Sequence, residues 1–100
     1  MPATIARTGN VAHLGLLGDF DFSSQEELRL VFEQAINAPE TEIEIDMRMT
    51  SFIDSSVIRM FLKLRDMAER SNKSLTIVNC SERIAEIFAI GGFDQIFNIR

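Results

Sequence analysis

Three polar side chains stand together in an otherwise apolar stretch of the sequence. The segment FIDSSVIRMFLKL runs from Phe52 to Leu64 and contains the carboxylate of Asp54 and the hydroxyls of Ser55 and Ser56. Apolar residues follow at helical spacing, so the three polar groups lie where a helix begins and where unpaired backbone N–H groups favour oxygen acceptors. Two interpretations stay open: an ordinary helix N-cap, or the edge of a surface that binds a partner.

A catalytic role for these serines lacks the accompanying residues that it would require. A serine nucleophile needs a base within hydrogen-bond reach, and the single histidine, His13, falls in a predicted strand without a nucleophile-elbow motif. One cysteine and one histidine do not make a tetrahedral metal site, and the aspartates at 19, 21, 46 and 54 lack the spacing of a calcium loop. No glycine-rich phosphate-binding motif is present. We therefore predict a protein that is not an enzyme and uses no cofactor or metal.

The helix predicted after the serines has a broad apolar arc. Its central stripe is formed by Val57, Phe61, Leu64 and Ala68. Methionines at 60 and 67 widen the stripe on one side, and Ile58 and Leu62 widen it on the other. The remaining side is polar and carries Arg59, Lys63, Asp66 and Arg70. Because the arc is wider than one sheet contact requires, either neighbouring helices flank it or the apolar margin next to Ser55 is exposed for a partner.

The elements that must position these residues alternate between strands and helices. Alternating or continuous apolar patterns predict strands at 4–7, 11–17, 42–47, 75–78 and 96–99. Helices are predicted from about residue 23 to before Pro39, over 54–70 and over 81–90, the first opened by a capping box of Ser23 with Glu26 or Ser24 with Glu27. The order β-β-α-β-α-β-α-β predicts an α/β fold, with a mixed, mostly parallel sheet of about five strands, helices packed on it, and a single domain over residues 1–100.

Charge and hydropathy exclude further classes of function. The 100 residues include 15 acidic and 10 basic side chains, for a formal net charge of -5, and no Lys/Arg-rich run interrupts this balance, so nucleic acid is not an expected partner. No apolar run approaches the roughly 20 residues that span a bilayer. The first ten residues lack the basic flank and apolar core of a signal peptide. We predict a cytoplasmic protein with no membrane partner.

The order of elements and four motifs together resemble a STAS domain, specifically the bacterial anti-sigma factor antagonist family. The motifs are GDFD after the second strand, MTSFIDSSVIRMFLKL after the third, LTIVNCSERIAEIF, and GGF near the end. The resemblance covers almost the whole chain. Its most specific element is the run FIDSS, which family members usually follow with Gly, whereas this sequence has Val57 at that place.

The resemblance implies a switch at the start of the second helix. In the family, the hydroxyl directly after the Asp is phosphorylated by an anti-sigma factor that is also a serine kinase; this position corresponds to Ser55, with Ser56 as the less favoured neighbour. Composition and spacing alone leave the two serines open, but a residue one step further into the helix has less freedom to enter a kinase active site. The implied partner surface consists of Asp19, Phe20, Asp21, Asp54, Ser55, Ser56, Ile58, Arg59 and Leu62.

The function implied by the resemblance is that of an anti-sigma factor antagonist. Its unphosphorylated form would bind the anti-sigma kinase and release a sigma factor or another output protein, phosphorylation of Ser55 would end that binding, and a serine phosphatase would reset the hydroxyl. The alternative is a STAS module that serves as a constitutive scaffold or accessory subunit of a signalling or transport complex, with Ser55 as a mere N-cap.

Overall fold

The main sheet has five strands in the order β1–β2–β4–β6–β7, and the computed structural model describes residues 3–100. The strands are β1 (Ala3–Thr8), β2 (Val11–Leu16), β4 (Glu42–Asp46), β6 (Ser74–Val78) and β7 (Asn98–Ile99). β1 pairs antiparallel with β2, and the other neighbours pair in parallel. The predicted mixed, mostly parallel sheet is therefore confirmed. Met1 and Pro2, the first two residues of the predicted domain, lie outside the described residues.

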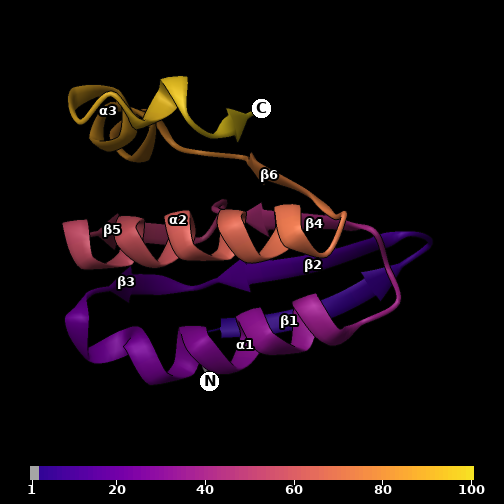
Figure 1. The fold of residues 1–100 in the computed structure, drawn as a ribbon. Helices are drawn as coiled ribbons and strands as arrows, with labels where there is room; N and C mark the ends of the chain where they lie inside the picture. Colours follow the sequence, from indigo (N-terminus) through magenta and orange to yellow (C-terminus); the bar gives the residue numbers. More distant parts are fainter. Residues whose placement is uncertain (1–2) are drawn as a thin grey trace.

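Three helices accompany the sheet: α1 (Gln25–Asn37), α2 (Ser55–Arg70) and α3 (Glu82–Ile90). In Figure 1, α1 and α2 run side by side along the sheet, and α3 lies with the C-terminal segment beyond β6. The alternation in β4 shows which face the core occupies, because Ile43 and Ile45 are buried while Glu42 and Glu44 point to the more open face. Within residues 3–100, no helix is long and apolar enough to cross a membrane.

Four phenylalanines join the helices to the end of the chain. Phe61 of α2 lies at the centre, with ring centroids 6.0 Å from Phe32 of α1, 6.4 Å from Phe88 of α3 and 6.4 Å from Phe97. All four side chains are buried. The central stripe predicted for α2 is confirmed, because its members are all fully or almost fully buried in this core. The position of α2, and of the polar groups at its start, is thus fixed by packing on several sides.

The predicted order of elements missed two short strands. β3 (Gly18–Phe20) and β5 (Thr50–Ile53) pair in parallel as a separate two-stranded sheet, with a one-turn helix η1 (Phe22–Ser24) after β3. Strands of three and four residues are too short to show a period of two, which is why no strand was predicted at either segment. The last predicted strand, 96–99, is also shorter: after the second one-turn helix, η2 (Phe93–Gln95), the N–H groups of Ile96 and Phe97 still bond to the carbonyl of Phe93, so β7 begins only at Asn98.

The capping box predicted for α1 is wrong. The box belongs to η1 instead: Oδ1 of Asp21 accepts from the backbone N–H of Ser23 at 2.9 Å, and Oγ of Ser24 accepts from the backbone N–H of Asp21 at 3.1 Å. Because its hydroxyl is used there, Ser24 makes no side-chain cap for α1, although it is the N-cap residue. The polar residues before α1 therefore order the GDFD segment.

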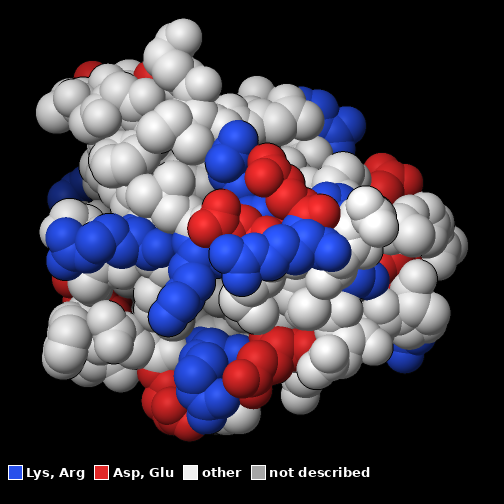
Figure 2. Space-filling view, viewed as in Figure 1, with Lys and Arg blue, Asp and Glu red and all other residues white. Residues whose placement is uncertain are grey.

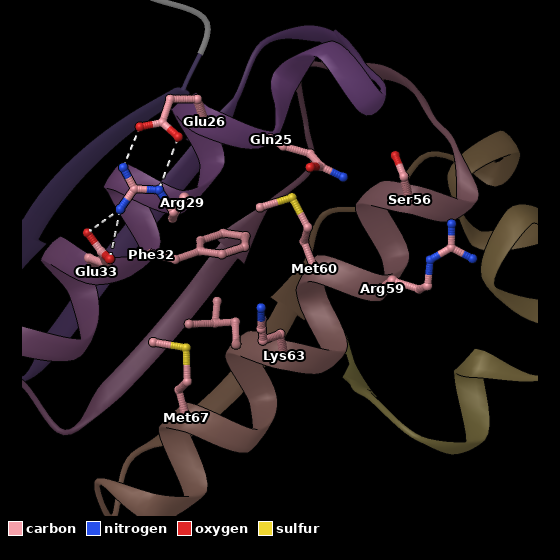
Figure 3. A pocket seen from close by; sticks show the side chains of 11 residues that line it. Gln25, Glu26, Arg29, Phe32, Glu33, Ser56, Arg59, Met60, Lys63 and Met67 are labelled. Atoms are coloured by element: carbon pink, nitrogen blue, oxygen red, sulfur yellow. Dashed lines mark hydrogen bonds and ion pairs between the residues drawn. The ribbon is translucent and has the colours of Figure 1, made fainter.

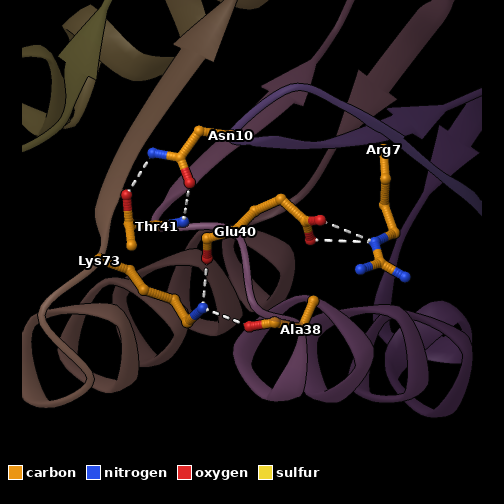
Figure 4. Close-up of polar contacts among 6 residues, drawn as sticks. All are labelled: Arg7, Asn10, Ala38, Glu40, Thr41 and Lys73. Atoms are coloured by element: carbon orange, nitrogen blue, oxygen red, sulfur yellow. Dashed lines mark hydrogen bonds and ion pairs between the residues drawn. The ribbon is translucent and has the colours of Figure 1, made fainter.

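Polar contacts secure the end of the molecule at which the β1–β2 hairpin turns (Figure 4). Nε of Arg7 contacts both carboxylate oxygens of the largely buried Glu40, at 3.0 and 2.9 Å. Nζ of Lys73, which follows α2, donates to the backbone carbonyls of Ala38 and Glu40. The connections that follow α1 and α2 are thus tied together, and both helices begin at the opposite end (Figure 1).

Candidate functional site

The two short strands bring the polar segments of the site together. Asp19 of β3 lies opposite Phe52 of β5. Just beyond these strands, the backbone N–H of Phe22 donates to Oδ2 of Asp54 at 3.2 Å. The GDFD and DSS segments, more than 30 residues apart in sequence, therefore adjoin at the carboxyl ends of the parallel strands, the edge at which α/β sheets usually place their functional loops.

Asp54 organises the start of α2. Its Oδ1 accepts from the backbone N–H of Val57 at 3.1 Å and from the hydroxyl of Ser56 at 2.6 Å, while Oδ2 accepts from Phe22. Burial alone would raise the pKa of Asp54. The hydrogen bonds from the Ser56 hydroxyl, from the N–H groups of Val57 and Ser56, and from Phe22 outweigh that effect and hold the pKa below its usual value. The N-cap interpretation is thus correct for Asp54, which also fastens the η1 segment to the helix.

The two serines differ in exposure and in bonding. Ser56 is only 7% exposed, and its hydroxyl donates to Asp54. Ser55, the first residue of α2, is exposed, and no hydrogen bond of its hydroxyl to another described residue is present. The geometry therefore leaves Ser55 as the accessible hydroxyl at this helix start and gives Ser56 a structural role.

Val57 occupies the place where the family usually has Gly, and the structure gives a reason. Its side chain is fully buried in the core, and its N–H donates to Asp54. A β-branched residue with this packing holds the first turn of α2 in one conformation. The turn that carries Ser55 consequently lacks the backbone freedom that a glycine at position 57 would give it.

The GDFD segment presents two carboxylates and hides one aromatic ring. Asp19 and Asp21 are exposed, and Asp21 is also the N-cap of η1. Phe20 was expected on the partner surface, but it is completely buried. That expectation is wrong because β3 alternates, so that the residue after Asp19 points into the core.

The apolar margin of α2 next to Ser55 is mostly covered. Ile58 is only 4% exposed and belongs to the core, so its assignment to the partner surface is wrong. Leu62 is half-buried and packs against the same core. Of the two explanations for the broad arc, flanking by neighbouring elements therefore holds on this side. Arg59 remains exposed, as expected.

Two exposed phenylalanines beside the site were missed by sequence reasoning. Phe22 is 71% exposed although its own N–H is bonded to Asp54, and Phe52 is 38% exposed. Exposed phenylalanines are notable because aromatic residues, Phe included, are enriched in the buried centres of protein–protein interfaces. No signal in the sequence marks this difference, because Phe20 and Phe22 are two residues apart and would share one face of a continuous strand. They diverge because β3 ends at Phe20 and η1 begins at Phe22.

A groove between α1 and α2 opens beside the site (Figure 3). It has a volume of about 570 Å³, an apolar lining that includes Phe32, Met60 and Met67, and Ser56 at one end. On the α1 side, Arg29 is neutralised by Glu26 and Glu33.

The α2 side of this groove carries free positive charge. Among residues 3–100, no carboxylate lies within ion-pair distance of Arg59 or Lys63. Figure 2 shows Lys and Arg side chains across the middle of this face, where α2 lies, with Asp and Glu side chains beside some of them. Arg59 and Lys63 are therefore two unpaired cations at this groove, among the described residues of a chain whose formal net charge is -5.

Comparisons with known proteins agree with this architecture. The family described as "Mlab, STAS domain" matches residues 3–99. A STAS-domain containing protein of Pseudomonas aeruginosa (strain UCBPP-PA14) is 33% identical over 91 residues, which is 91% of this chain and 89% of that protein.

Solved structures share the fold. The anti-sigma factor antagonist SpoIIAA in its unphosphorylated form superposes with a TM-score of 0.74 at 20% identity, over 98% of this chain and 86% of that one. The Bacillus cell fate determinant SpoIIAA in the phosphorylated form gives 0.73 at 21% identity, over 98% and 90%. A sulfate transporter family protein from Wolinella succinogenes gives 0.78 at 18% identity, over 93% and 75%.

The family match and the relative carry the assignment, since the structural likenesses at these identities concern the fold. At the start of α2, Asp54 is the N-cap, Ser55 is the first helical residue, and the hydroxyl of Ser56 donates to Asp54. The resemblance drawn from the FIDSS and GDFD motifs is confirmed at the level of the family. The chain belongs to the STAS domain family.

Proposed function

We propose that this chain is a cytoplasmic anti-sigma factor antagonist controlled by phosphorylation of Ser55. Its unphosphorylated form binds an anti-sigma factor that is also a serine kinase, and thereby releases a sigma factor or another output protein. The kinase phosphorylates Ser55, which ends the binding, and a serine phosphatase restores the hydroxyl.

The observation that carries this proposal is the contrast between the two serines. Ser55 is exposed at a rigid helix start, whereas Ser56 is nearly buried and bonded to Asp54. A kinase needs a hydroxyl that can enter its active site without unfolding the helix, and only Ser55 meets that requirement here. The fold likeness to SpoIIAA, which was solved in both an unphosphorylated and a phosphorylated form, supports a switch of this type.

The surroundings of Ser55 explain why a phosphate would end binding. The partner surface that we propose combines the exposed ring of Phe22 with Asp19, Asp21, Ser55 and Arg59. Phosphorylation adds a charge of about -1.5 to -2 at pH 7. An interface that covers the exposed ring would have to desolvate that charge close to the carboxylate of Asp54, which disfavours binding by several kcal/mol in order of magnitude.

A second candidate function is a constitutive accessory subunit. It is favoured by the likeness to the sulfate transporter family protein and by the buried Val57, which departs from the usual family motif two residues after Ser55. In that case Phe22 and the carboxylates would bind a partner permanently, and Ser55 would remain unmodified.

Affinity purification from the organism's own cells separates the two functions. We expect the parent chain and Ser55→Ala to retain a serine kinase, identified by mass spectrometry, and Ser55→Asp to lose it because of the added charge. Ser56→Asp is not a suitable control because that side chain is bonded within the fold; Asp66→Ala, on the exposed side of α2, is the matched control. Retention of one partner at equal yield by all variants would favour the constitutive subunit.

A further inference from the structure

Three of the backbone hydrogen-bond donors at the start of α2 are already in use. A helix N-terminus ordinarily offers its free N–H groups to a phosphate. Here the N–H groups of Ser56 and Val57 point at the carboxylate of Asp54 and stabilise its charge. The N–H of Ile58 donates to the backbone carbonyl of Asp54 at 3.2 Å. A phosphate on Ser55 would also lie next to the ionised Asp54 in the chain. A cation from elsewhere in the chain would therefore stabilise the phosphate.

Arg59 is the cation best placed to contact a phosphate on Ser55. It lies four residues after Ser55, and side chains at this spacing on a helix have Cβ atoms about 5–6 Å apart. The order is also the favourable one, with the anion nearer the N-terminus and the cation one turn later. Figure 3 shows the guanidinium of Arg59 turned toward the N-terminal end of α2, where Ser56 is drawn.

The guanidinium of Arg59 is available for this contact. It is exposed, and in the described part of the chain it has no carboxylate partner, unlike Arg29 and Arg65, which pair with glutamates on their own helices. Arginine binds phosphate oxygens through two parallel N–H donors, which makes such pairs stronger than a contact with a single ammonium.

We propose that Arg59 is the phosphate-binding residue of the switch and pairs with the phosphoryl group on Ser55 within the same helix. The proposal rests on the function proposed above and adds the contact that stabilises the phosphorylated form. Arg59 also lines the groove between α1 and α2 together with Lys63. Pairing with the phosphate withdraws Arg59 from that groove, so one modification both adds negative charge beside Phe22 and removes a positive contact from the adjoining surface.

The test uses protein in which phosphoserine is incorporated at position 55 by an expanded genetic code, so no kinase is required. Phosphorus NMR over a pH titration in about 0.15 M salt gives the second pKa of the phosphate. The variants are Arg59→Gln and the matched control Lys63→Gln, which removes the same charge one further turn away. A neighbouring cation favours the dianion, so we expect this pKa to be about 0.3 units or more higher in Arg59→Gln than in the parent, and the change in Lys63→Gln to be smaller.

Two results would overturn the proposal. One is an unchanged phosphate pKa in Arg59→Gln, and the other is an equal change in Lys63→Gln, which would indicate only the general field of α2. Because the phosphoserine is built in during synthesis, these results do not depend on whether cells modify Ser55. Failure of the proposed function would appear separately, as absence of phosphate on the protein from its own cells.

Discussion

Replacing Asp54 tests whether this carboxylate fastens the site together. Asp54→Ala removes the N-cap of α2, a loss worth about 0.5–2 kcal/mol. It also removes the acceptor for the nearly buried Ser56 hydroxyl and for the N–H of Phe22. A buried hydroxyl left without a partner costs about 1–3 kcal/mol. Because these contacts share one carboxylate they are not additive, and we expect the free energy of unfolding to fall by about 2–3 kcal/mol in total.

Urea unfolding at pH 7 measures this change. Asp54→Asn keeps an oxygen acceptor at the N-cap and loses only the charge, so its loss should be about 1 kcal/mol or less. Asp66→Ala, on the exposed side of the same helix, is the control and should differ from the parent by less than about 0.5 kcal/mol. If Asp54→Ala unfolds at the same urea concentration as Asp66→Ala, then the carboxylate does not organise this segment.

The same variants give the sign of the pH dependence. The pKa of Asp54 is lower in the folded state than in the unfolded chain, so the ionised carboxylate stabilises the fold above the unfolded pKa of about 3.9. That stabilisation is lost as the pH falls through the folded pKa. The difference in stability between the parent and Asp54→Asn should therefore shrink as the pH is lowered below about 4. A difference that grows on acidification would contradict the direction of the shift.

Three further changes separate packing from binding. Phe20→Ala should lower the free energy of unfolding by about 3–5 kcal/mol in urea unfolding, because the ring is completely buried. Phe22→Ala should change that free energy by less than about 0.5 kcal/mol but weaken partner binding at least about tenfold, as measured by calorimetry. Gly92→Ala should cost about 1–2 kcal/mol in urea unfolding, since this residue adopts a φ of 75° after α3; an unchanged midpoint would argue against that conformation. Ser55→Asp should weaken binding to the partner kinase in calorimetry while Ser55→Ala leaves it intact, and equal affinities would refute the charge argument.

Long periodic segments made most of the fold predictable. The apolar stripe of α2 and the alternation in β4 each extend over enough residues to specify one periodicity and one buried face. β3 and β5 were missed because each strand pairs with the other across about 30 residues of sequence. Pairing at that distance leaves no mark in the local sequence pattern of either strand. The capping box failed for a similar reason, since Asp21 and Ser24 bond to each other instead of to α1.

The site was predictable in its position but not in its details. The sequence places Asp54, Ser55 and Ser56 at a helix start, and the structure agrees. It could not show that Ser56 is bonded to Asp54, that Ile58 is covered, or that Phe22 is exposed, because each depends on which neighbour reaches that point from another element. Burial at the end of a helix is decided by packing across the chain rather than by helical periodicity alone.

The measurement that tests the central claim most directly is the intact mass of the protein after incubation with its partner kinase and ATP. The parent, Ser55→Ala and Ser56→Ala chains are compared, with circular dichroism to confirm that each is folded. We predict one phosphate on the parent and on Ser56→Ala, and none on Ser55→Ala. Phosphate retained on Ser55→Ala and absent from Ser56→Ala would contradict the assignment, and absence of phosphate from all three would contradict the switch itself.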